Sequence, residues 1–136
     1  LNEARRVLVS QGRLILFEPY VSWCSRPVYA LFHHEPLALS PSIDLGESCP
    51  RPRGYYAAQG NATRLFFWRE NPGWPEGWAV LSAEAFASFS YLLSGGFSQP
   101  ALYPAALRPL VQRFDALLSR WPRVFGARCL VVLRPK

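Results

Sequence analysis

The sequence has no methionine and a single lysine, Lys136, whereas fourteen of its 136 residues are arginine. Because no initiator methionine is present, we expect further polypeptide before Leu1. The net charge of +6 is scattered, with arginine clusters only at 5–6 and 51–53. A nucleic-acid-binding protein usually concentrates its basic residues on one face and carries a recognisable motif. The composition therefore predicts no nucleic-acid partner and favours scattered, solvated arginines.

Cysteine is also scarce, and its three positions, Cys24, Cys49 and Cys129, form neither a disulfide framework nor a zinc pattern. Reduced thiols are typical of a cytoplasmic protein, and the N-terminus lacks the apolar region of a signal peptide. Charge is absent from residues 85–107, but glycines and prolines interrupt this run. A single membrane-spanning helix is therefore excluded there, and we expect a cytoplasmic protein.

Residues 3–20 carry the most informative pattern in the chain. Leu8 follows Ala4 at helical spacing, and Gly12 stands where a helix end favours a residue at positive φ. The apolar run 14–17 is typical of a strand covered on both faces, and proline then ends it. A helix leading into a buried strand is the second half of a βαβ unit, whose first strand is not in this sequence.

The remaining chain alternates between helical and extended patterns, with no internal repeat. Residues 61–70 fit a helix or a strand, and we favour a helix because Asn61 is a good N-cap. The other expected elements are helices at 26–36 and 108–121, strands at 78–86 and 129–133, and a mobile loop at 40–60. This order predicts a single partial α/β domain over residues 1–136 with a layered sheet.

The stretch Arg6-Val-Leu, a turn ending at Gly12 and the segment 13–19 resemble the region around the fifth strand of class I S-adenosylmethionine-dependent methyltransferases. Gln11 departs from the glycine pair of that family. The segment 91–97 is similar to the corresponding segment of bacterial methyltransferases of this class. The resemblance implies the C-terminal half of a Rossmann-like methyltransferase sheet, with about three strands and flanking helices. The last strand would be antiparallel and inserted beside the fifth, so that 78–86 and 128–133 supply the closing strands.

The resemblance implies S-adenosylmethionine as the cofactor of the complete enzyme, but the glycine-rich turn that lets backbone approach this cofactor has no counterpart. The run Ser94-Gly95-Gly96 lacks the G-x-G-x-x-G spacing and indicates a turn. We therefore expect no complete cofactor site and no activity from this chain alone. The alternative hypothesis is a non-catalytic α/β module that pairs with a partner through an open sheet edge.

Ligands of open α/β sheets bind at the carboxyl ends of strands. Glu18, Tyr20 and Ser22 follow the strand at 14–17, so the sequence predicts that they contact a small-molecule acceptor. The alternative is that Glu18 pairs with an arginine and that Tyr20 packs inside the protein. The sequence does not identify the acceptor.

His33 and His34 are candidate catalytic residues, because a histidine pKa suits a general base for an acceptor hydroxyl at neutral pH. Otherwise they are ordinary residues at a helix surface. Adjacent positions on a helix point apart, so we expect no metal site. The uncharged segment 86–103 includes Tyr91, a candidate substrate-binding residue. This segment is a core and turn, a pocket wall, or a surface that engages a lipid-linked acceptor.

Overall fold

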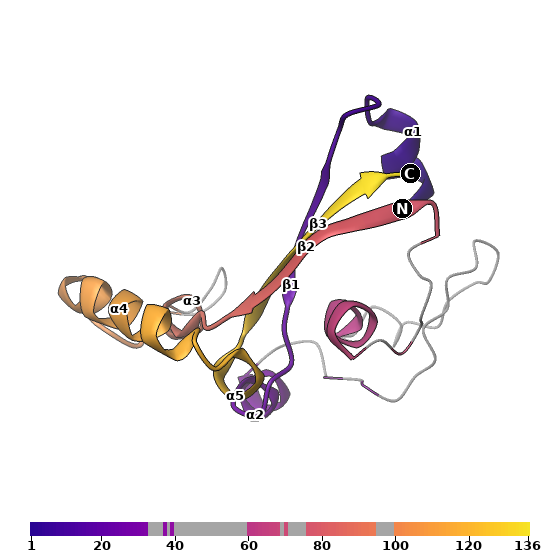
Figure 1. Ribbon diagram of the computed structural model, residues 1–136. Helices are drawn as coiled ribbons and strands as arrows, with labels where there is room; N and C mark the ends of the chain where they lie inside the picture. The colour runs from indigo at the N-terminus through magenta and orange to yellow at the C-terminus, as the bar shows by residue number, and fades with distance from the viewer. Residues whose placement is uncertain (33–36, 38, 40–59, 69, 71–75, 95–99) are drawn as a thin grey trace.

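The computed structural model describes residues 1–32, 37, 39, 60–68, 70, 76–94 and 100–136 (Figure 1). It is a mixed α/β structure with a small sheet and several short helices. The strands are β1 (Leu14–Pro19), β2 (Trp78–Phe86) and β3 (Arg128–Pro135). The helices are α1 (Asn2–Val7), α2 (Ser25–Phe32), α3 (Phe89–Leu93), α4 (Arg108–Leu118) and α5 (Pro122–Phe125), with a π-helix at Thr63–Phe67 and a 3-10 turn at Ala105–Leu107.

The sheet has the order β1-β3-β2, with β3 antiparallel to both neighbours. Val131 of β3 lies opposite Leu16 on one side and Ala83 on the other, and a bulge interrupts the β2–β3 ladder between Val80 and Ser82. Because both outer strands oppose β3, they run in the same direction and their carboxyl ends lie at the same end of the sheet. The strands expected at 78–86 and 129–133 are confirmed.

One face of the sheet carries the core. Cys129, Val131 and Leu133 alternate along β3 and are fully buried, and Trp78 joins them at the start of β2. Helix α1, its C-cap residue Leu8 and the π-helix supply the side chains that cover this face: Ala4, Leu8, Phe66 and Phe67. Period-two alternation along the central strand therefore decides which residues form the core.

The opposite face of the sheet is open among the described residues. Ile15 and Phe17 of β1 remain 61% and 54% exposed, although their neighbours Leu14 and Leu16 pack against the core. The prediction of a strand covered on both faces is therefore wrong for the described part of the chain. A continuous apolar run does not reveal whether an element is present to cover each face.

Several boundaries also differ from the expected ones. Gly12 does not end a helix at positive φ; α1 stops at Val7, and the Gly12 N–H donates to the Val9 carbonyl at 2.7 Å in a separate turn. Helix α2 is confirmed through Phe32. The expected helix at 61–70 forms a π-helix, whereas the expected loop at 40–60 lies outside the described residues except for Gly60.

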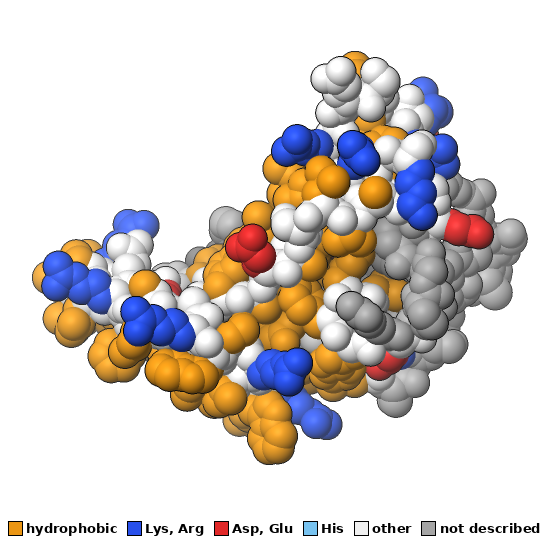
Figure 2. Space-filling view, viewed as in Figure 1, with side chains coloured by type: hydrophobic (Ala, Val, Ile, Leu, Met, Phe, Trp, Pro, Cys, Tyr) orange, Lys and Arg blue, Asp and Glu red, His pale blue; other side chains and the backbone are white. Residues whose placement is uncertain are grey.

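Helix α4 is confirmed, with Pro109 in its first turn, but its apolar stripe does not face the sheet. Leu110 and Phe114 are each 56% exposed, and hydrophobic and basic side chains share the visible surface of α4 in Figure 2. The helix is instead attached through Asp115, which is buried. None of the described helices is long and apolar enough to cross a membrane.

Candidate functional site

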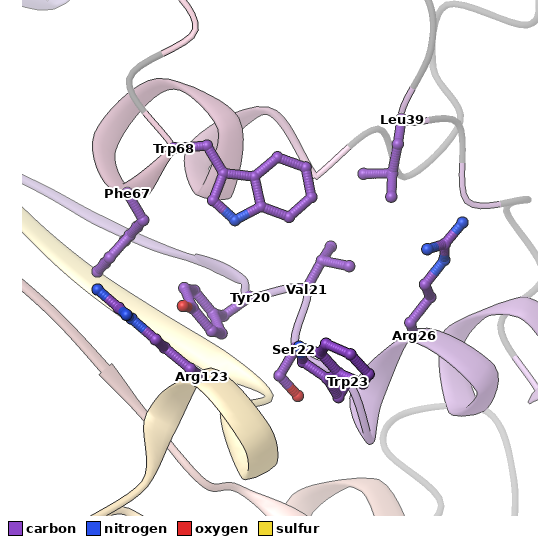
Figure 3. A pocket seen from close by; sticks show the side chains of 9 residues that line it. All are labelled: Tyr20, Val21, Ser22, Trp23, Arg26, Leu39, Phe67, Trp68 and Arg123. Atoms are coloured by element: carbon purple, nitrogen blue, oxygen red, sulfur yellow. The ribbon is translucent and has the colours of Figure 1, made fainter.

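A cavity of about 480 Å³ lies beside the carboxyl end of β1 (Figure 3). Its walls come from the segment that follows β1, from the first turn of α2, from the π-helix and from α5. The lining residues are Tyr20, Val21, Ser22, Trp23, Arg26, Leu39, Phe67, Trp68 and Arg123. The cavity therefore occupies the end of the sheet where open α/β proteins bind ligands.

Backbone hydrogen bonds fix the floor of this cavity. The Tyr20 N–H donates to the Ala127 carbonyl at 2.9 Å, which continues the β1–β3 pairing by one residue. The Val21 N–H donates to Thr63 Oγ1 at 2.9 Å, and that hydroxyl is 3.4 Å from the Pro19 carbonyl. Because Thr63 is buried in the π-helix, it joins this helix to the end of β1.

Two serines form the turn between the cavity floor and α2. The Ser22 N–H donates to Ser25 Oγ at 2.8 Å, and the Ser25 N–H donates to Ser22 Oγ at 3.1 Å. The Ser25 hydroxyl also donates to the Tyr20 carbonyl at 2.8 Å. This reciprocal pairing satisfies backbone groups near the start of α2, as an N-terminal cap does. The Ser22 hydroxyl therefore has a structural role in addition to any contact with a ligand.

Aromatic side chains make the walls. The Phe67 ring meets the Tyr20 ring edge to face, with 4.9 Å between centroids. Trp68 follows directly in the sequence. Its backbone N–H donates to the Thr63 carbonyl at 3.0 Å, which is the five-residue spacing of a π-helix. Single π turns are frequent at functional sites, since the extra residue redirects the side chains that follow. Here the turn leaves Trp68 beside the cavity and 47% exposed.

Basic side chains give the cavity its charge. Arg26 and Arg123 line it, and none of the described lining residues is acidic. Burial raises the pKa of the Tyr20 hydroxyl, while the nearby Arg123 charge acts in the opposite direction. Tyr20 is therefore a neutral hydrogen-bonding group at physiological pH rather than a base.

The structure brings together two of the four predicted substrate-binding residues, Tyr20 and Ser22. Glu18 does not line the cavity; burial raises the pKa of its carboxyl, and Arg128 opposes this shift. Tyr91 lies elsewhere, with its ring centroid 4.5 Å from the Arg128 guanidinium carbon, which is also 5.5 Å from the Phe17 ring. Phe17 belongs to the open face, so Tyr91 does not share the cavity with Tyr20.

The candidate catalytic residues His33 and His34 lie outside the described residues. The predictions also missed part of the cavity. Trp23 and Arg26 follow the predicted substrate-binding residues Tyr20 and Ser22 closely in the sequence. A prediction that extended a few residues further past β1 would have included them. Nothing in the sequence indicated Arg123, because only the β1–β3 pairing brings α5 to this end of the sheet.

The described glycines beside this cavity do not form a cradle for a nucleotide-type cofactor. Glycines that cradle such a group have open space beside the Cα atom, whereas the space beside the glycines next to this cavity is occupied by other atoms of the protein. A Cβ on Gly60 or Gly126 would lie 2.7 Å from a side-chain atom of Val21 or Tyr20, respectively. Within the described ranges, no group of three acidic, histidine or cysteine side chains is placed to hold a metal ion.

Comparison of the chain with protein families, with curated proteins and with solved structures finds no match.

Proposed function

We propose that this chain forms the substrate side of an S-adenosylmethionine-dependent methyltransferase and contributes the last three strands of its sheet. The strand arrangement supports the proposal. β3 is the last strand in the sequence and lies antiparallel between two strands that run in the same direction. The sequence resemblance implies this arrangement, in which β1, β2 and β3 take the places of the fifth, sixth and seventh strands.

The position of the cavity supports a role in binding the methyl acceptor. Methyl transfer is a displacement, and holding the acceptor in line contributes much of its rate. The cavity at the carboxyl end of β1 is where this fold would hold an acceptor, with Tyr20 and Ser22 in its wall. The sequence resemblance supports cofactor-binding strands in polypeptide outside these 136 residues, and the described glycines beside the cavity form no cradle for the cofactor.

Calorimetry with S-adenosylmethionine tests this proposal on two proteins. The 136-residue chain alone should show no saturable binding. A longer product of the same reading frame, extended before Leu1, should bind the cofactor with a dissociation constant in the micromolar range. Saturable binding to the 136-residue chain would contradict the division of the site, and an extension without a strand and glycine-rich turn would contradict the function.

A non-catalytic binding module is the second candidate, and the exposed sheet supports it. β1 is an edge strand of the described sheet, and Ile15 and Phe17 are exposed on the open face. Edge strands of this kind invite pairing with another chain. If the purified chain is monomeric and unfolds in one cooperative step, the module is favoured; an aggregated or molten chain favours a sheet that needs its other strands.

A further inference from the structure

Two arginines stand at separate positions around the aromatic cavity. Arg26 belongs to the first turn of α2 and Arg123 to α5. Figure 3 shows their guanidinium groups on opposite sides of residues 20–22, with Arg123 toward Phe67 and Arg26 toward Leu39. The cavity is therefore apolar in its middle and cationic at its borders.

The positive charge of these arginines is not neutralised within the described part of the chain. The ion pairs between described residues join Arg6 to Glu3 and Arg64 to Glu70, and neither involves the cavity arginines. Uncompensated charges of one sign at a cleft raise the local concentration of ligands of the opposite sign. Guanidinium groups also bind carboxylates through paired hydrogen bonds. The charge therefore favours an anionic ligand.

The walls define the rest of that ligand. Trp23 is 83% exposed and Trp68 is 47% exposed, so both indole rings present apolar area to solvent at the cavity. Aromatic rings offer large apolar contact areas and pack against other rings in offset-stacked or edge-to-face arrangements. The volume of about 480 Å³ lies within the usual range for pockets that hold small molecules. A planar ring system fits this combination better than a flexible polar molecule.

We propose that the cavity binds a small planar carboxylate, with its ring between the aromatic walls and its carboxylate at Arg26 or Arg123. The further assignment of this ligand as the methyl acceptor rests on the proposed function. The binding itself does not, because the residues that it invokes belong to the described part of the cavity lining. The proposal therefore specifies the class of substrate for the cavity that we assign to the methyl acceptor.

Binding of 2-naphthoate and its neutral analogue 2-naphthamide to the 136-residue chain tests the proposal by calorimetry at low ionic strength. The acid should bind about tenfold more tightly than the amide, since a charge-assisted contact distinguishes them. The double variant Arg26→Gln/Arg123→Gln should lose this preference and bind both compounds equally. Both arginines are exposed, so this variant should keep its fold, which thermal unfolding by circular dichroism verifies.

The matched control is Arg108→Gln/Arg113→Gln, which removes two exposed charges from α4 and gives the same net charge. This variant should retain the preference for the acid. Equal affinity for acid and amide in the unsubstituted chain would overturn the proposal, as would equal losses in the two double variants, because the second result indicates nonspecific attraction.

Arginine modification by phenylglyoxal provides a second measurement that needs no variant. Peptide mass spectrometry should show that 2-naphthoate slows modification of Arg26 or Arg123 severalfold but leaves Arg108 unaffected. Lack of protection at both cavity arginines would also overturn the proposal. If 2-naphthoate binds as expected while the extended protein fails to bind S-adenosylmethionine, the ligand site stands and the methyltransferase function does not.

Discussion

At the scale of single residues, the burial of Cys129 makes the stability of the fold depend on pH. Cys129 belongs to β3; its side chain is fully buried in the core with Tyr20 and Ala62, and its thiol lies 3.6 Å from the Glu18 carbonyl oxygen. Burial raises the pKa of the Cys129 thiol from 9.0 to about 12. The folded chain therefore keeps this thiol protonated at pH values where the unfolded chain releases the proton.

The expected result is a loss of stability in alkali. The contribution of Cys129 is fully present below pH 9 and falls by about 1.4 kcal/mol per pH unit as the pH rises toward the folded-state pKa. Urea unfolding from pH 7 to pH 10 measures this slope. Cys129→Ala should remove most of it, whereas Cys24→Ala, at a half-buried position, should retain it. The same slope in both variants would contradict the assignment to Cys129.

At the scale of elements, Asp115 attaches α4 to α3. Its carboxylate accepts hydrogen bonds from the Phe89 N–H at 2.7 Å and the Ser90 N–H at 3.0 Å, and also from the Ser90 hydroxyl. These N–H groups lie in the first turn of α3, where a helix has no internal acceptors for them. A residue from another helix therefore provides the cap.

We expect Asp115→Ala to lower the free energy of unfolding by about 2 kcal/mol, because two backbone donors lose a charged acceptor. Asp115→Asn should cost less, since its amide keeps one acceptor oxygen. Urea denaturation measures both variants, with Gln112→Ala at an exposed position of the same helix as the control. A cost for Asp115→Ala as small as that of the control would show that the cap does not stabilise α3.

The elements also show how far the sequence determines this fold. Alternation correctly placed β2 and helical spacing correctly placed α4, whereas β1 and β3 were predicted from short continuous apolar runs. Periodicity did not predict that the apolar stripe of α4 is exposed, as at Phe114, because it identifies a face and not what covers it. It also missed the π-helix at Thr63–Phe67, whose five-residue spacing leaves no distinct pattern in so short a segment.

The candidate site was predictable only where it is local in sequence. Tyr20 and Ser22 followed from their position after a strand, which is a general rule for open α/β sheets. The same rule also selected Glu18, which precedes the turn into the cavity and does not line it. Arg123 could not be predicted, because its position depends on pairing between distant strands.

At the scale of the whole molecule, the sheet formed by the described residues has one strand paired on both sides and two edge strands. We expect native-state hydrogen exchange, followed by NMR, to be slowest for the amides of β3. Amides of β1 that point away from β3 should exchange fast, since no described strand pairs with them. Equally slow exchange at those amides would show that another strand pairs with this edge.

The central position of β3 has a consequence for synthesis of the chain on the ribosome. Glu18 and Cys129 face each other across the β1–β3 ladder although 111 residues separate them. β1 and β2 make no ladder with each other, so neither gains a strand partner from this sheet until β3 has been translated. The apolar side chains of β1 therefore remain without their partner strand in the growing chain, because contacts of such long range form slowly. Apolar side chains exposed in this way favour chaperone binding.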